Sequence, residues 1–173
     1  MARLRKFVCY RNLERPHTRK SKYRKKSFVR GAPVCKIVKF NLGNLTAKFS
    51  HRVDLAVTKD LQIRDNALES ARLTCNRTLE KSIGKSNFRI QVRVYPHHVL
   101  REHALAAGAG ADRFSSGMAH SFGKPIGNAC QLRNGQLIMS IFVNEANINI
   151  AKTALKKANH KLPCRCRVLI NQL

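Results

Sequence analysis

The sequence predicts an α+β fold in which a mostly antiparallel sheet carries two helices packed on one side. Several segments alternate apolar and polar residues with the period of half-buried strands, two others repeat apolar residues with the helical period, and turn signals separate them. The 173 residues are enough to bury one core without disulfides or metals. We therefore expect a basic N-terminal arm over residues 1–33 and a single α+β domain over residues 34–173.

The first strands are expected just after residue 33. Two apolar stretches, 35–40 (CKIVKF) and 45–49 (LTAKF), flank the sequence NLGN. A glycine turn between two such stretches predicts a β-hairpin. Residues 53–57 are the next strand candidate.

A helix is predicted over residues 65–83, where apolar residues recur at helical spacing. Asn66 and Glu69 are placed to form a capping box, and Gly84 is placed to end the helix. The apolar stripe consists of Leu68, Ala71, Cys75, Leu79 and Ile83. The other face carries basic residues that either meet phosphate or form a solvated surface, namely Arg72, Arg77 and Lys81.

Two strands and a second hairpin are predicted in the middle of the domain. Residues 88–95 alternate as a half-buried strand with Arg89 and Arg93 on the polar side. Residues 129–133 and 136–143 are joined by Asn-Gly, which is a strong two-residue hairpin signal.

The C-terminal part predicts a helix and a closing strand. Asn147 or Asn149 caps a helix that continues to Asn159, and Leu162 and Pro163 follow its end. Its apolar stripe consists of Ala151, Ala154, Leu155 and Ala158. Residues 164–170 alternate as the last strand.

The stretch at about 101–128 is too long for an ordinary connection. It reads REHALAAGAGADRFSSGMAHSFGKPIGN and holds five of the nine glycines. Connections in compact domains usually run about 4–6 residues, and structureless ones beyond about 12–15 are functional or disordered. Because the chain is well patterned on both sides, we expect the domain to present this arm to a partner.

Charge indicates what that partner is. The chain carries 34 Lys and Arg against 9 Asp and Glu, a net charge of +25, which repels itself unless a polyanion neutralises it. Twelve of these cations lie in the first 30 residues with a single acid, Glu14, and too few large apolar side chains to fold alone. We expect a segment that orders on RNA or DNA, where Tyr10, Tyr23 and Phe28 suit base stacking. A merely solvated tail is the alternative.

The cysteines and histidines predict no disulfide and no metal site. There is no C-x-x-C pair, and Cys164 and Cys166 point to the same face of a strand. His97, His98 and His103 lack matching cysteine or carboxylate spacing. We expect reduced cysteines, no metal and no cofactor.

An enzyme is not expected. The GAGAD of the arm is too short for a dinucleotide fingerprint and lacks the end of a phosphate-binding P-loop. Ser115 and Ser116 near His120 have no orienting acid, and Asp112 has Arg113 beside it.

A membrane protein is not expected either. No apolar run approaches the roughly 18–20 residues of a spanning helix, and no apolar core follows the basic start as in a signal peptide. The expected location is cytoplasmic, with no membrane partner.

The arm also carries a specific resemblance. The string GADRFSSGMAHSFGKPIG, preceded by RVYPHHVLR, resembles the signature of the universal large-subunit ribosomal protein family numbered sixteen in bacteria and ten in archaea and eukaryotes. The strand, arm, Asn-Gly turn, helix and final strand also follow the family's order, so the resemblance covers nearly the whole chain. The matching positions are Gly110, Ala111, Asp112, Arg113, Gly117, Met118, Gly123, Lys124, Pro125 and Gly127, with Met1-Ala2-Arg3, Cys9-Tyr10-Arg11 and Lys22-Tyr23-Arg24.

The resemblance implies a structural constituent of the large ribosomal subunit. Such a protein binds large-subunit rRNA at the base of the central protuberance, beside the tRNA path, and helps to order the peptidyl-transferase region and position tRNA. The arm, roughly residues 102–120, would point toward the peptidyl-transferase centre and tRNA near the A and P sites. Peptide bond formation itself belongs to rRNA. The implied partners also include neighbouring large-subunit proteins, the chain is not expected to form a homo-oligomer, and the implied fold has a hammerhead-like β motif.

Two groups of residues are expected to make these contacts. In the arm, the glycines allow positive φ and close backbone approach to RNA, while Arg113 and Lys124 neutralise phosphate. Phe114, Met118 and Phe122 stack on bases or pack against the domain. The expected RNA-binding residues are Arg3, Arg5, Lys6, Tyr10, Arg11, Arg15, Arg19, Lys20, Lys22, Tyr23, Arg24, Lys25, Lys26, Arg89 and Arg93. The expected residues near tRNA and the peptidyl-transferase centre are Gly108, Gly110, Asp112, Arg113, Gly117, Met118, Gly123, Lys124 and Gly127.

Departures from the family pattern limit what is carried over. Eukaryotic members often have Arg at the position of Ala119 and Trp at that of Phe122, so contacts of those side chains are not assigned. The end at Leu173, soon after the last strand, fits an archaeal-type length. A free-standing RNA chaperone or general RNA-binding module is the alternative function. A DNA-binding structural protein is disfavoured, because neither a recognition helix nor a dimer zipper is apparent.

Overall fold

The computed structural model describes the folded domain and part of the N-terminal segment. The described residues are 5–16, 18, 23, 25, 29, 31, 33–102, 110 and 123–173. The strands are β1 (Asn41–Gly43), β2 (His51–Val57), β3 (Leu61–Arg64), β4 (Arg89–Val92), β5 (His98–Glu102), β6 (Lys124–Leu132), β7 (Leu137–Val143) and β8 (Cys166–Gln172). The helices are α1 (Asp65–Ile83) and α3 (Ile148–Asn159), with short 3-10 turns η1 (Phe7–Tyr10), η3 (Lys85–Asn87) and η5 (Glu145–Asn147).

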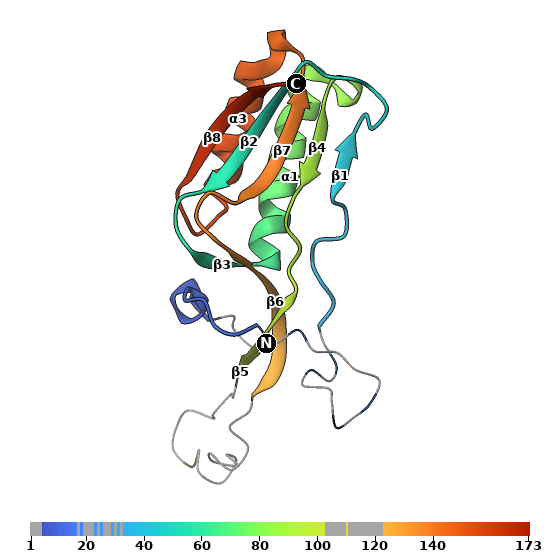
Figure 1. Ribbon diagram of the computed structural model, residues 1–173. Helices are drawn as coiled ribbons and strands as arrows, with labels where there is room; N and C mark the ends of the chain where they lie inside the picture. Colours follow the sequence, from blue (N-terminus) through green and yellow to red (C-terminus); the bar gives the residue numbers. More distant parts are fainter. Residues whose placement is uncertain are drawn as a thin grey trace.

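The strands form two antiparallel sheets. A five-stranded sheet runs β1-β4-β7-β2-β8, and a three-stranded sheet runs β3-β6-β5. Helices α1 and α3 lie together behind the larger sheet, and the smaller sheet lies at its lower end (Figure 1). The predicted α+β class with two helices on one side is confirmed, although the strands divide into two sheets.

The core lies between the larger sheet and the two helices. Inner-face residues of β2, β4 and β7 are buried, whereas Cys166 and Val168 of β8 are partly buried. The predicted stripes of both helices are fully buried except Ile83, which is partly buried. The predicted alternation of residues 88–95 is confirmed, since Phe88, Ile90, Val92 and Val94 are all buried, but the strand itself, β4, is shorter than predicted and covers only Arg89–Val92. Both helices and residues 88–95 therefore follow their local hydrophobic period.

Helix α1 has the predicted bounds but a different start. Arg64 occupies the N-cap position without a side-chain cap, so the predicted capping box is wrong. Asn66 lies inside the helix, and its N–H donates to Asp65 Oδ1 at 2.8 Å. The buried Asp65 carboxylate also accepts the N–H of Lys36 at 2.9 Å, which joins the helix start to the preceding segment. Gly84 ends the helix as predicted, with φ +77° and its N–H bonded to Glu80 O.

Arg72 does not share the solvated face of α1. Its side chain is buried and donates to Glu69 three residues earlier, at 2.9 Å from Nε to Oε2. That hydrogen bond raises the pKa of Arg72. Arg77 and Lys81 are exposed, so only these two of the three predicted residues keep the expected position.

The first predicted hairpin is wrong. The NLGN sequence contains strand β1, which pairs with β4 so that Gly43 lies opposite Arg89, and neither 35–40 nor 45–49 is a strand. Gly43 has φ +83°, and a Cβ there would lie 2.2 Å from Phe88 O. Asn44 then turns the chain, because its Oδ1 accepts N–H groups from the two residues that follow Leu45. The strand partner is thus distant in sequence.

The second predicted hairpin is half right. The Asn-Gly turn is present, with Gly135 at φ +81° and Gln136 N–H bonded to Arg133 O at 3.0 Å. However, β6 and β7 belong to different sheets. Gly135 N–H donates to Val57 O at 2.8 Å, and Val57 N–H donates to Gln136 O at 3.0 Å. The turn therefore binds the end of β2 and carries the chain from one sheet to the other.

The C-terminal elements agree with the sequence pattern. Asn147 is at the N-cap position of α3, although without a side-chain cap, and the helix ends at Asn159 as predicted. Strand β8 begins at Cys166, two residues later than expected, and runs to Gln172. No helix within the described residues has the length and apolar character that a membrane crossing needs.

Candidate nucleic-acid interface

The base of the glycine-rich arm is held by two paired strands. Strand β5 ends with Arg101 and Glu102, and β6 begins with Lys124, which lies opposite Glu102 in the antiparallel register. Arg101 Nε donates to Gly123 O at 2.8 Å, and burial lowers the pKa of Arg101. A register shift between Leu100 and Arg101 marks a bulge at this edge. Both ends of the arm therefore leave the domain at one place.

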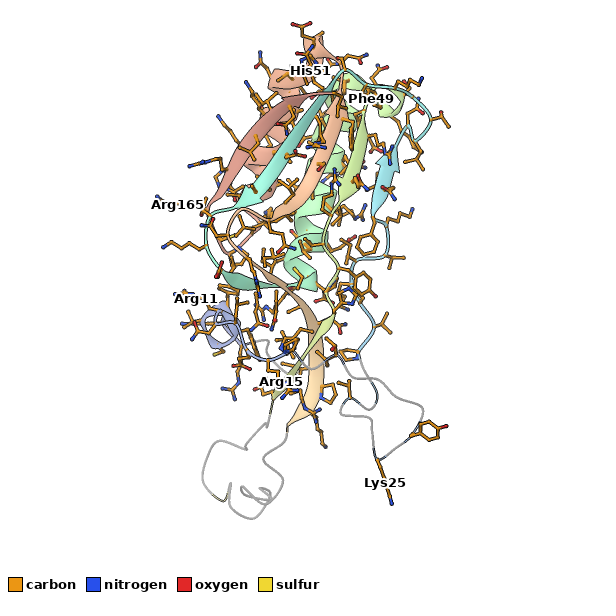
Figure 2. The ribbon with its side chains drawn as sticks, in the orientation of Figure 1. Arg11, Arg15, Lys25, Phe49, His51 and Arg165 are labelled. Carbon is orange, nitrogen blue, oxygen red and sulfur yellow. The ribbon has the colours of Figure 1, made fainter. Side chains whose placement is uncertain are left out.

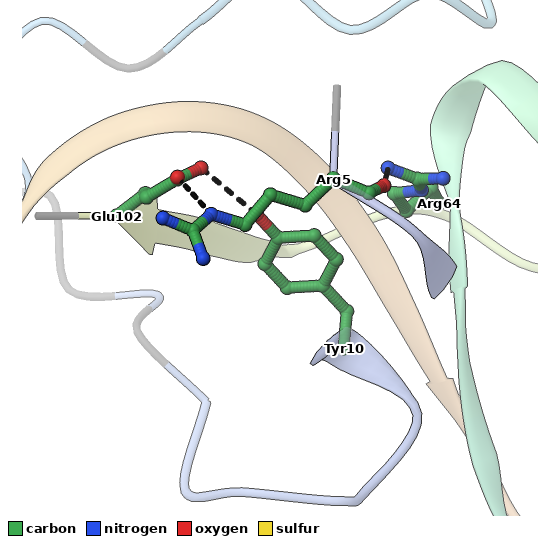
Figure 3. A network of polar contacts seen from close by, with 4 residues as sticks. All are labelled: Arg5, Tyr10, Arg64 and Glu102. Carbon is green, nitrogen blue, oxygen red and sulfur yellow. Dashed lines mark hydrogen bonds and ion pairs between the residues drawn. The ribbon is translucent and has the colours of Figure 1, made fainter. Parts of the chain in front are cut away.

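A carboxylate at this base binds two residues of the N-terminal segment (Figure 3). Glu102 forms an ion pair with Arg5 through Oε1, and its Oε2 accepts the Tyr10 hydroxyl at 3.1 Å. Arg64 of β3 donates to Arg5 O at 3.1 Å, and its guanidinium lies 5.5 Å from the Tyr10 ring centroid. Burial, followed by the hydrogen bond to Glu102, raises the pKa of Tyr10 to about 12. We call these four residues, Arg5, Tyr10, Arg64 and Glu102, the clamp.

Further contacts fix the N-terminal segment along the smaller sheet. Gln62 N–H donates to Arg11 O at 3.3 Å, and the Gln62 side-chain amide donates to Asn12 O. Gln131 Nε2 donates to Glu14 O at 2.7 Å. Residues 5–14 are thus attached through their backbone carbonyl groups, which residue composition alone does not reveal.

The predicted RNA-binding residues divide into four sets. Exposed cations without a carboxylate partner within the described residues are Lys6, Arg11, Arg15 and Lys25, of which Lys25 points away from the domain in Figure 2. Tyr23 is 59% exposed, whereas Arg5 and Tyr10 belong to the clamp. Arg89 lies in β4, and Arg93 follows its end and donates its N–H to Ile138 O of β7 at 2.8 Å. Outside the described residues lie Arg3, Arg19, Lys20, Lys22, Arg24 and Lys26.

The arm is described only at its base and at one glycine. Gly110 is exposed with φ +80°, as predicted. Gly127 does not have a positive φ, and that part of the prediction is wrong, because Gly127 is an ordinary strand residue opposite Leu100. The remaining predicted arm residues that lie outside the described residues are Gly108, Asp112, Arg113, Gly117 and Met118, with Phe114, Ala119 and Phe122.

Sequence reasoning missed two of the clamp residues, Arg64 and Glu102. The available signal was the scarcity of acids, because a lone carboxylate in so basic a chain attracts cations. Its partners lie 97 and 92 residues away in the sequence, so only the fold identifies them.

The cysteines and carboxylates form no metal site in the described part of the chain, where no three potential ligands gather. None of the six cysteines forms a disulfide within the described residues. Cys164 and Cys166 share one face with their sulfurs 3.6 Å apart, and the hydrogen bond between them lowers the pKa of Cys164.

Comparison with known proteins decides the family. The sequence model of the family "Ribosomal protein L16p/L10e" matches residues 18–169. This chain belongs to that family. It is 46% identical over 150 residues to the large ribosomal subunit protein uL16 of Methanocella arvoryzae, covering 87% of each chain. The uL16 proteins of Methanococcus aeolicus and Staphylothermus marinus are 43% and 40% identical, each match covering 98% of this chain and 95% of the relative. The resemblance first seen in the arm is therefore confirmed, and it extends over nearly the whole chain.

Proposed function

We propose that this chain binds large-subunit rRNA beside the tRNA path through its N-terminal segment and its glycine-rich arm, and helps to order the peptidyl-transferase region. As a member of a ribosomal protein family, the chain is a structural constituent of the large ribosomal subunit and not an enzyme. Its location is that of the subunit, which is cytoplasmic in archaea, the source of these relatives. We also propose that the chain contacts tRNA near the A and P sites. It does so as one copy per subunit and not as a homo-oligomer.

Glu102 is the residue on which the proposal rests most directly. Glu102 is the last residue of β5, at the base of the arm, and it binds the N-terminal segment through Arg5 and Tyr10. The exposed cations of the segment are therefore held beside the point where the arm leaves the domain. Adjacent cations on a fixed framework suit binding to phosphate groups, which position a protein on RNA.

The expected phosphate contacts in the arm are separate from this framework. Lys124 is exposed at the first position of β6 and supplies one cation at the arm's base. Arg113 would supply another, because a guanidinium binds phosphate in a forked geometry that lysine does not reproduce. Arg113→Ala should slow translation while leaving the domain folded, and unchanged translation would overturn this role.

Co-sedimentation tests the proposed function as a whole. The chain should be present in large-subunit particles at near one copy per particle and should remain there in salt that strips loosely bound proteins. Neighbouring large-subunit proteins should be present in the same particles. A reconstruction of those particles with and without tRNA should place the arm beside the tRNA path.

A free-standing RNA chaperone is the second candidate, favoured only by the basic N-terminal segment. It would be found mostly in the free pool rather than in particles. For the isolated chain, neutralising on the order of 10 phosphates gives a slope of log affinity against log salt of roughly −7 to −9. Because both candidates share this slope, the fraction of chain in particles separates them.

A further inference from the structure

Within the described residues, the helices cover only one face of the five-stranded sheet, and Figure 1 looks onto the other face. Successive strand residues point to opposite faces, so Val53 and Leu55 of β2 enter the core while Arg52 and Asp54 point to the open face. Contacts across strands agree, because Asn171 of β8 donates to Asp54 Oδ2 at 2.9 Å. This open face is made of strand residues from all five strands.

Four side chains form a row across the open face. The register places Arg89 of β4 opposite Phe142 of β7, Phe142 opposite Arg52 of β2, and Arg52 opposite Asn171 of β8. Neighbouring strands lie about 4.8 Å apart, so the row spans about 14 Å. The Arg89 guanidinium lies 5.3 Å from the Phe142 ring centroid. We call Arg89, Phe142, Arg52 and Asn171 the sheet row.

Positive charge dominates this face. Arg93 and Arg167 add two further guanidiniums, and Arg93 Nε donates to Ser140 Oγ at 3.0 Å. Asp54 is the one carboxylate that the strands point to this side, and Arg52 Nε already donates to it at 2.8 Å. Arg89, Arg93 and Arg167 have no carboxylate partner within the described residues. Three guanidinium charges are therefore left without a counter-ion.

We propose that the open sheet face, centred on the sheet row, binds an unpaired segment of large-subunit rRNA. Phe142 stacks against a base, and the arginines around it bind phosphates. The proposal rests on the proposed function, since it takes rRNA as the partner, and it adds a surface at the opposite end of the domain from β5 (Figure 1).

The chemistry of the row favours unpaired RNA over other polyanions. Guanidinium groups bind phosphate in a forked geometry and stack on planar rings, which lysine does not do. An aromatic ring on a sheet stacks on bases only where these are unstacked, as in loops and single strands, because a duplex hides its base faces. An acidic protein segment would match the charge but would leave no role for a ring between two arginines.

Matched variants of the full chain test the arginines. Arg89→Ala/Arg167→Ala removes two cations from the face, and Arg77→Ala/Arg133→Ala removes two exposed cations from α1 and the β6–β7 turn. The probe is a labelled single-stranded RNA of mixed pyrimidine sequence, about 12 nucleotides long. We expect the face variant to bind about tenfold or more weakly and its salt slope to fall by about 1.4 for two contacts. Equal losses in the two variants would mean that only net charge matters and would overturn the proposal.

Phe142→Leu tests the stacking. It should weaken binding of the single-stranded probe by about fivefold or more, since base stacking on aromatic rings contributes about that much, and leave binding of an RNA duplex of the same length unchanged. Equal effects on the two probes would exclude an unpaired segment. Circular dichroism before binding checks that each variant is folded.

Crosslinking in native particles separates this proposal from the proposed function. Ultraviolet light should crosslink the wild-type β7 peptide that carries Phe142 to rRNA. Large subunits that contain the chain but give no such crosslink, or that crosslink β7 to an acidic protein instead, would overturn the sheet-face proposal alone. Absence of the chain from large subunits would overturn both.

Discussion

The Tyr10 hydroxyl donates to Glu102 Oε2 at 3.1 Å, across 92 residues of sequence. The same carboxylate pairs with Arg5, so one side chain of β5 binds a residue just before η1 and the last residue of η1. Because Glu102 is the last residue of β5, at the base of the arm, any movement of the N-terminal segment is coupled to the arm's base. The clamp can therefore be tested by changing Glu102 alone, with no change in the arm residues that follow it.

Glu102→Gln should loosen the N-terminal segment. The amide still accepts one hydrogen bond but carries no charge to attract Arg5, and loss of one partly buried hydrogen bond costs about 1 kcal/mol. Hydrogen exchange of the Gln62 amide, which donates to Arg11 O, should therefore accelerate about fivefold. Glu145→Gln, in the exposed η5 turn, is the matched control and should leave that exchange rate unchanged. An unchanged rate in both variants would show that the clamp does not hold the segment.

Tyr10 should ionise late when the pH is raised. Burial and the hydrogen bond to Glu102 raise its pKa from 10.0 to about 12. A group whose folded pKa is raised stabilises the fold fully below its unfolded pKa, and that contribution is lost as the pH rises through the folded value. The contribution of Tyr10 is therefore complete below about pH 10 and lost near pH 12. Tyrosinate absorbance of the wild type minus that of Tyr10→Phe isolates this transition, and a midpoint near pH 10 would contradict a partly buried phenol bonded to Glu102.

Arg72→Leu should destabilise the fold, although the sequence places Arg72 beside solvent-facing cations. Its buried guanidinium donates to Glu69, and removing one partner of a buried hydrogen-bonded pair costs about 1–3 kcal/mol. Arg77→Leu changes an exposed residue of the same helix and should cost no more than about 0.5 kcal/mol. Urea unfolding measures both free energies. Equal values would mean that the Arg72 pair contributes nothing.

Both helices were predictable from sequence because their information is local. The stripe from Leu68 to Leu79 reports the buried face directly, and Gly84 supplies the conformation that ends the helix. The first hairpin prediction placed a turn where strand β1 lies, and the second placed the turn correctly but not the strand that the turn binds. Asn-Leu-Gly pairs with β4, some 48 residues later, and the Asn-Gly turn bonds to Val57 instead of closing its own hairpin. Turn chemistry therefore locates a change of direction and does not identify the neighbouring strand.

The candidate site shows the same division. Composition identified the basic segment and the arm, because these are properties of a continuous stretch. The clamp was not predictable, since Glu102 meets Arg5 and Tyr10 only after β5 and η1 have been brought together. Alternation placed Arg89 on an outer face, but its neighbour Phe142 follows from strand register, which periodicity alone does not specify.

The buried cysteines should resist alkylation in the native chain. Burial raises the pKa of Cys75 and of Cys130 to about 12, so little reactive thiolate is present near neutral pH. Cys9 is exposed and should react with iodoacetamide, and Cys164 should react before Cys166 because their hydrogen bond lowers the pKa of Cys164 and raises that of Cys166. Mass spectrometry of tryptic peptides gives the order of modification, with the urea-unfolded chain as control. Modification of Cys75 as fast as Cys9 would contradict the buried position.

Gly43→Ala should destabilise the fold by more than the cost of its positive φ alone. Gly43 and Gly135 have nearly the same φ, +83° and +81°, but an added Cβ meets Phe88 O at 2.2 Å at the first position and nothing within 4 Å at the second. Gly135→Ala therefore measures the cost of a positive φ alone, about 1–2 kcal/mol. Gly43→Ala adds a clash with a backbone oxygen that is fixed by the β1–β4 pairing, which should bring the loss to about 3 kcal/mol or more. For a chain of this length each kcal/mol lowers the Tm by about 2–4 °C, so the two variants should be well separated in thermal unfolding. Equal Tm values would show that β1 can move away from β4, and the short edge strand would then be an adaptable part of the sheet.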